Sequence, residues 1–176
     1  MKTIQLYADP RLEAGKVTEN LYGLFFEGAN GHFSGGILAP DTEEKTEEGF
    51  LKDALDLILD LHPGFIRFPG GNNMATWRWK NTIGPMKERR ANVMPAHSSG
   101  GRIDIERNDM GLDEFARMIR RIGADGMMTV NLCTDSLADR LDLAEYCHVS
   151  GGTHWSDLRR RNGSKDPYHF IKYWYL

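Results

Sequence analysis

The sequence reads Phe65-Ile66-Arg67-Phe68-Pro69-Gly70-Gly71-Asn72-Asn73 at the point that decides the fold. Its first part is short and mainly apolar, which is typical of a buried β-strand, and the glycines and asparagines that follow are typical of a loop. Upstream, Pro63-Gly64 ends a segment from Thr46 to Leu61 in which apolar residues recur at helical spacing. A helix followed by a strand and a polar loop predicts one repeat of a parallel α/β sheet.

The same alternation extends in both directions. An apolar run from Leu21 to Glu27 predicts an earlier strand, and Thr3 to Ala8 alternates in period two as a further strand would. The stretch from Asn73 to Asp109 shows no sustained period and is predicted to be a long loop. Further elements are expected downstream: a helix from Leu112 closed by Gly123, a strand from Gly126 to Leu132, a helix opening near Asp135 or Ser136, a short helix from Trp155 to Arg161, and a strand from Phe170 to Leu176.

Barrel-type strands are predicted to begin near Leu21, Phe65, Met127 and Ile171. A closed (β/α)8 barrel needs eight strands, so these cannot close one. The sheet is therefore either open and doubly wound or half of a barrel.

Composition limits the classes of function. The chain has 176 residues, 40% of them hydrophobic, and a net charge of -3, which favours one globular domain and disfavours nucleic acid as a partner. Two cysteines make a disulfide framework improbable, and six histidines without ligand spacing indicate no metal site. No cofactor is expected. The absence of an apolar run of sufficient length predicts a soluble, cytoplasmic protein with no membrane partner.

Polar residues stand at the ends of three predicted strands. Glu27 ends the first, Arg67 and Asn72 belong to the second and its loop, and Asn131 ends the third. The carboxyl ends of parallel strands meet at one mouth, where a carboxylate, a guanidinium and two amides could hydrogen-bond the hydroxyls of a sugar ring. Trp77 and Trp79, after the second strand, could add an apolar face.

Each of these residues also has a structural interpretation. Glu27 and Arg67 could form a partly buried ion pair, which on spacing alone is an equal alternative to ligand contact. For Trp77 we favour packing in the core. Asn131 could satisfy backbone groups at a strand end. A phosphate cradle at Gly70-Gly71 is a weak alternative, because the Lys and the Ser or Thr of a P-loop are missing.

Five segments in order resemble family 51 glycoside hydrolases, the α-L-arabinofuranosidases, and the resemblance extends from about residue 4 to Leu176. Leu21 to Glu27 resembles the family's first barrel strand, and Ile66 to Asn72 its second strand and loop. The other matching segments are Trp79 with Ile83-Gly84-Pro85, Gly111 with Asp113-Glu114-Phe115, and a C-terminal series of Glu145-Tyr146-Cys147, Gly151-Gly152, Trp155, Asp157-Leu158-Arg159-Arg160, Asn162-Gly163, Pro167-Tyr168 and Lys172-Tyr173-Trp174.

The resemblance implies that residues 17–176 are the first four β/α units of an incomplete (β/α)8 barrel, preceded in residues 1–16 by one strand of an accessory β-domain. It implies a retaining hydrolase acting on terminal α-L-arabinofuranosyl residues of arabinan or arabinoxylan oligosaccharides. Substrate-binding positions carried over by the resemblance, together with the tryptophan suggested above, are Glu27, Arg67, Asn72, Asn131 and Trp79. Asn131 is followed by Leu132-Cys133-Thr134-Asp135, which departs from the Gly-Thr-Gly-type turn usual in the family.

Retaining hydrolysis needs two carboxyl groups about 5 Å apart. The resemblance places the acid/base glutamate just beyond Leu176 and the nucleophile further downstream, so no catalytic residue is assigned and we expect this chain alone to be inactive. Two other functions are compatible with these residues. One is a non-catalytic, sugar-binding half barrel, and the other is an interaction module whose sheet edges pair with another chain. Members of the family are often oligomers, so a homo-oligomer of the full-length enzyme is a further expectation.

Overall fold

The computed structural model describes residues 2–28, 32–33, 35–39, 41–95 and 103–176. Its centre is a sheet with the strand order β1-β2-β5-β6, in which every neighbouring pair is parallel. This arrangement confirms the predicted α/β class with a parallel sheet. The strands are β1 (Gly23–Phe25), β2 (Phe65–Phe68), β5 (Asp125–Thr129) and β6 (Ile171–Tyr175).

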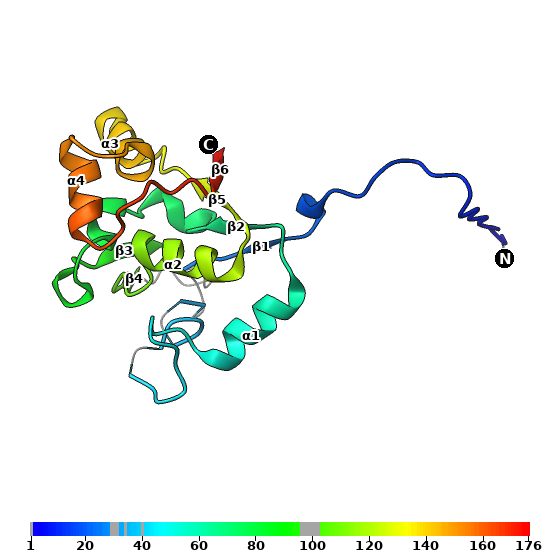
Figure 1. Cartoon of the computed structure of the whole chain (residues 1–176), viewed down its shortest axis with the longest axis horizontal. Coiled ribbons are helices and arrows are strands. Elements are labelled where there is room, and N and C mark those ends of the chain that lie inside the picture. The colour runs from blue at the N-terminus through cyan, green and yellow to red at the C-terminus, as the bar shows by residue number, and fades with distance from the viewer. Residues whose placement is uncertain (1, 29–31, 34, 40, 96–102) are drawn as a thin grey trace.

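Helices connect the parallel strands, as the predicted β/α repeats require. They are α1 (Lys52–Leu61), α2 (Leu112–Ile122), α3 (Leu137–His148) and α4 (His154–Arg161). Figure 1 shows α3 and α4 side by side at one end of the molecule. The predicted helix starts and ends are confirmed at two points, because Ser136 caps α3 and Gly123, with φ of 81°, ends α2.

One face of the sheet packs against helices. Ile66, Phe68 and Met128 are fully buried on that face, and the Phe68 ring stacks on Phe115 of α2 with centroids 4.5 Å apart. Each fully buried side chain of this size stabilises the fold by about 1.5–3 kcal/mol. Arg67, which alternates with these residues along β2, projects from the opposite face. The strand therefore supplies the core with one set of side chains and the site with the other.

The predicted long loop contains regular structure. The described residues between 72 and 106 form three 3-10 helices and an antiparallel strand pair, and the prediction of an irregular stretch was wrong. Short elements of this kind have no sustained period, so the sequence pattern does not reveal them. They are η2 (Asn72–Ala75), η3 (Trp79–Thr82), η4 (Met86–Glu88), β3 (Asn92–Pro95) and β4 (Ile103–Glu106), in addition to η1 (Glu19–Leu21) near the start of the chain.

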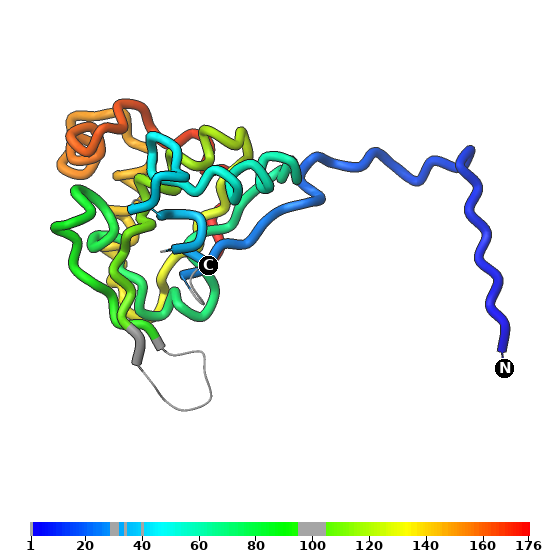
Figure 2. Tube along the Cα trace, turned by 90° about the horizontal axis from the view of Figure 1, so that it is seen from below, coloured from blue at the N-terminus to red at the C-terminus, as the bar shows by residue number. Residues whose placement is uncertain are grey.

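Two other predictions need correction. No strand forms at Thr3 to Ala8, where Leu6 is 92% exposed, because a strand needs a backbone partner and the described residues supply none there. Figures 1 and 2 show this segment extending away from the body of the molecule. Helix α1 begins at Lys52 rather than near Thr46, because the preceding residues form isolated bridges and Gly49 has φ of 92°.

Candidate functional site

A carboxylate and a loop meet at the carboxyl ends of β1 and β2. Oε1 of Glu27 accepts hydrogen bonds from the backbone N–H groups of Gly71, at 3.0 Å, and Asn73, at 3.3 Å. The loop comes close because it carries no side chain where it passes the carboxylate. A Cβ atom on Gly70 would stand 2.8 Å from Cγ of Glu27. The absence of a side chain at Gly70 thus allows the second loop to fold onto the residue that ends the first strand.

Arg67 lies beside this carboxylate on the sheet face that points away from the helices. Both side chains approach Gly71. A Cβ atom added to Gly71 would lie 3.6 Å from Nη2 of Arg67 and 3.7 Å from Oε1 of Glu27. The guanidinium carbon lies 3.9 Å from the centroid of the Phe25 ring and 5.2 Å from that of Tyr175. Its buried Nε has no hydrogen-bond acceptor among the described residues. The group is therefore held by aromatic rings and keeps a donor without an internal partner.

Asn72 and Asn73 follow directly in η2. The Asn72 side chain is exposed, so the fold brings an open amide next to the loop that holds Glu27. Asn73 is 2% exposed, and its Oδ1 lacks a hydrogen-bond partner in the described part of the chain. Asn73 was not predicted as a site residue. The doubled asparagine after two glycines is the one signal that points to it.

Asn131 ties two loops together. Its Nδ2 donates to the Trp77 carbonyl at 2.9 Å and to Oγ1 of Thr134 at 2.8 Å, while its Oδ1 accepts from the N–H groups of Cys133 and Thr134. Because these bonds use both amide hydrogens, the structure matches the backbone-satisfying interpretation. Asn131 shapes the mouth by joining the loop after β5 to the loop after β2.

The tryptophans lie in the interior. Trp77 is 4% exposed and packs edge-on against Phe68, which confirms the packing interpretation. Trp79 is 1% exposed, and its Nε1 donates to the Asp139 carbonyl at 2.8 Å. Its ring packs between Tyr146 and Trp155 among the helices. The fold does not bring Trp79 together with Glu27, Arg67 and Asn72.

A second carboxylate approaches the site from the hairpin. Oε2 of Glu106, at the end of β4, stands 3.7 Å from the position of a Cβ on Gly28, the residue after Glu27. Burial raises the pKa of Glu106, although its other oxygen accepts from the Asn108 N–H at 3.1 Å. Glu106 could not be predicted as a site residue from the sequence, because it falls in the stretch predicted to be a loop.

Within the described ranges, no group of three or more His, Cys, Asp or Glu side chains is arranged to hold a metal ion. In the same residues, no helix combines the length and the apolar character needed to cross a bilayer. The arrangement consists of a carboxylate, a guanidinium and an exposed amide at one strand end. Such a set offers hydrogen-bond donors and acceptors to a small polyhydroxylated ligand.

Comparison with protein families gives a match to the alpha-L-arabinofuranosidase 1 domain over residues 57–176. The chain is 34% identical over 176 residues to an intracellular exo-alpha-(1->5)-L-arabinofuranosidase of Acetivibrio thermocellus, covering all of this chain and 34% of that protein. It is 37% identical over 173 residues to an exo-alpha-(1->6)-L-arabinofuranosidase of Bifidobacterium longum, covering 98% of this chain and 32% of that protein. The chain thus spans about one third of the length of these relatives.

Solved structures show the same relationship. An arabinofuranosidase structure superposes with a TM-score of 0.85 at 32% identity, covering 94% of this chain and 33% of the other. The arabinose complex of a Thermotoga maritima α-L-arabinofuranosidase gives 0.81 at 33% identity, covering 88% of this chain and 31% of the other. The four-stranded sheet therefore matches part of a barrel rather than a separate doubly wound fold.

Proposed function

The chain belongs to the α-L-arabinofuranosidase family, family 51 of the glycoside hydrolases, and from this premise we propose that Glu27, Arg67 and Asn72 bind a terminal α-L-arabinofuranosyl residue. The approach of Glu27 and Arg67 to Gly71 where β1 and β2 end, with Asn72 next along the same loop, carries the proposal. The proposed substrates are arabinan or arabinoxylan oligosaccharides. A cytoplasmic location is part of the proposal, supported by the relatives that are named intracellular enzymes.

The three side chains suit a furanose ring in complementary ways. The Glu27 carboxylate is oriented by the two backbone N–H groups on Oε1 and can accept further hydrogen bonds from hydroxyls. Arg67 brings a donor without an internal partner, and Asn72 brings both a donor and an acceptor. Glu27, held by backbone N–H groups, and Arg67, held by aromatic rings, are positioned before the ligand arrives and can therefore select hydroxyl positions.

Hydrolysis requires more than this set. In a retaining mechanism one carboxyl group donates a proton and a second attacks the anomeric carbon. We propose that these 176 residues bind the sugar weakly and do not turn it over, because Glu27 is used to hold the ring. The division of the chain into residues 1–16 and 17–176 stays a prediction.

Titration of the 15N-labelled chain with methyl α-L-arabinofuranoside, followed by NMR, tests the binding. We expect a dissociation constant on the order of millimolar and shifts of the Gly71 and Asn73 amide signals, which report directly on Glu27. Gly70→Ala should weaken binding because its Cβ displaces Cγ of Glu27. Gly15→Ala is the matched control, because Gly15 has nearly the same φ as Gly70, 159° against 156°, and a Cβ there would meet no atom within 4 Å.

Equal shifts with glucose, or no shifts at these amides, would overturn the binding proposal. Clear release of phenol from an aryl arabinofuranoside would overturn the proposed inactivity. The two results are independent of each other.

One observation favours a second function, that of an interaction module. Among the described residues, no strand pairs with the outer edges of β1 and β6, and Phe25, Tyr175 and Leu176 are 45%, 51% and 78% exposed. Such edges pair with other chains. Concentration-dependent association in sedimentation experiments, without sugar binding, would support this function or the homo-oligomer expected of the family.

A further inference from the structure

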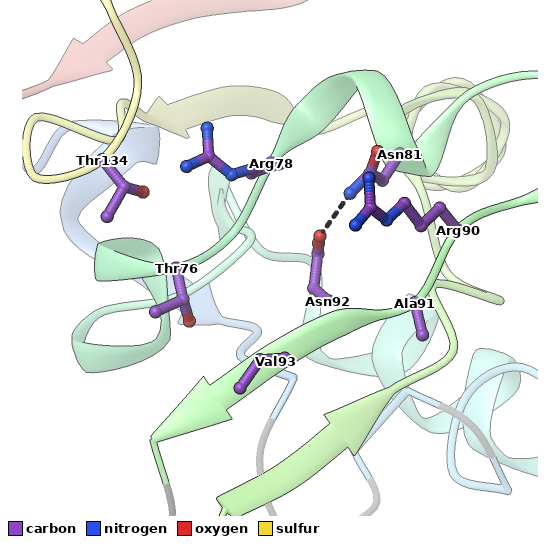
Figure 3. Close-up of a pocket in the computed structure, with 8 residues that line it drawn as sticks. All are labelled: Thr76, Arg78, Asn81, Arg90, Ala91, Asn92, Val93 and Thr134. Carbon is purple, nitrogen blue, oxygen red and sulfur yellow. Dashed lines mark hydrogen bonds between the residues drawn. The ribbon is translucent and has the colours of Figure 1, made fainter.

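A pocket separate from the Glu27 site lies at the same end of the sheet, between the loop after β2 and the β3–β4 hairpin. It has a volume of about 280 Å³. Figure 3 shows Arg78 and Arg90 on two sides of it, with Asn92 between them. The residues that carry the argument are Thr76, Arg78, Asn81, Arg90, Asn92 and Thr134.

The pocket is positively charged on a chain whose net charge is -3. Two arginines line it, and no acidic side chain is among the described residues that line it. Arg90 is exposed and makes no ion pair within the described part of the chain. Arg78 is 50% exposed and reaches one oxygen of Asp135 at 3.3 Å, which leaves most of its donors available. An anionic ligand would therefore meet two guanidinium groups with spare hydrogen-bond donors.

The floor of this pocket is ordered by a chain of amides. Asn81 donates to Oδ1 of Asn92 at 2.8 Å, and Asn92 donates to Oδ1 of Asn108 at 3.0 Å. Asn108 in turn donates to the Arg90 carbonyl at 2.7 Å. Asn92 and Asn108 are 3% and 1% exposed, so this chain is protected from water. The backbone that carries Arg90 is thus fixed before any ligand binds.

The pocket is connected to the proposed sugar site through shared loops. Thr134 donates to the Ala75 carbonyl at 2.8 Å and accepts from Asn131, the residue that joins the loops after β2 and β5. The hairpin that forms the other wall ends in Glu106, beside Gly28. The pocket and the proposed sugar site are therefore both built on the loops that follow the carboxyl ends of the strands.

We propose that this pocket binds the carboxylate of a uronic acid unit that lies next to the arabinofuranosyl residue in an acidic polysaccharide. The planar guanidinium groups match a carboxylate, while the threonine hydroxyls and the Asn81 amide suit the hydroxyls of the same ring. Inorganic sulfate is also an anion and carries twice the charge of a carboxylate, but it lacks the hydroxyls of the sugar ring. The inference rests on the proposed function for the identity of the neighbouring sugar.

The test is an NMR titration of the labelled chain with sodium glucuronate, glucose and sodium sulfate, with the arginine side-chain Nε–H signals observed. We expect glucuronate to shift the signals of Arg78 and Arg90, sulfate to bind several-fold more weakly, and glucose to leave them unchanged. Arg78→Gln and Arg90→Gln should each weaken glucuronate binding by about 5- to 10-fold. Arg11→Gln, which removes the same charge from a side chain 87% exposed in the N-terminal segment, should have no effect.

Two results would overturn the inference. One is the absence of glucuronate shifts at both arginines, and the other is sulfate binding as tight as glucuronate binding, which would identify a general anion site. Gly70→Ala separates this inference from the proposed function, because it should weaken arabinofuranoside binding and leave glucuronate binding intact. If neither the wild-type chain nor any variant binds the arabinofuranoside while glucuronate still binds, the proposed arabinofuranosyl site is refuted and the glucuronate pocket is not.

Discussion

Replacement of Arg89 by methionine should lower the free energy of unfolding more than the removal of any charge at the surface. Arg89 and Glu114 form a buried ion pair, with side chains 2% and 4% exposed and nitrogen-to-oxygen distances of 2.7 and 2.9 Å. Arg89 also donates to the Gly84 carbonyl, and Glu114 accepts from the Gly111 N–H at the start of α2. The pair thus fastens the segment before the hairpin to helix α2.

The magnitude follows from what the substitution leaves behind. Removing one partner of a buried ion pair costs about 3–5 kcal/mol, because the remaining charge stays buried without compensation. Arg117 still contacts Glu114 at 2.6 Å and offsets part of this cost, so we expect a loss of about 3 kcal/mol. The double variant Arg89→Met/Glu114→Gln also removes the buried negative charge. It should therefore recover about 1 kcal/mol, or about one third, of the stability that Arg89→Met loses.

Urea unfolding followed by tryptophan fluorescence measures these free energies. The control is Arg121→Met, whose side chain is 52% exposed and lies 3.8 Å from Glu48, and it should change the free energy of unfolding by less than about 0.5 kcal/mol. A loss below about 1 kcal/mol for Arg89→Met would refute the reasoning, as would a double variant no more stable than the single one.

Three further predictions concern buried polar groups. Burial raises the pKa of Asp113, so the wild-type melting temperature should fall as the pH rises from 3.8 through the folded-state pKa. The Asp113→Asn variant, whose amide oxygen still accepts from the tyrosine hydroxyls, should show a smaller fall, and parallel pH profiles of the two proteins would contradict this prediction. Trp79→Phe should cost about 1–2 kcal/mol in urea unfolding through the lost bond to Asp139 and leave arabinofuranoside binding unchanged, so that weaker binding would place Trp79 in the site after all. Asn131→Ala should cost about 2–3 kcal/mol and shift the amide signals of the loops after β2 and β5, and an unchanged spectrum would show that this amide does not join them.

Much of the fold could be predicted from local pattern. The segments that became β2, α2 and β5 show their periods in the sequence because each buries one face, and burial requires apolar residues at the spacing of the element. The hairpin β3–β4 could not be predicted in this way. It depends on Arg89, Asn92 and Asn108, whose bonds reach residues distant in the chain.

The sequence by itself determined the α/β class, the order of the parallel elements and the family to which the chain belongs, because these depend on periodicity and on the type and spacing of residues. Tertiary structure alone decided which polar residues meet. It brought Glu27 and Arg67 to Gly71, and it buried Trp79 among the helices. It also set Arg78 and Arg90 around one pocket. The physical reason is that a hydrogen bond or a charge acts over a few ångströms of space, and only the packed chain places residues from separate loops within that range.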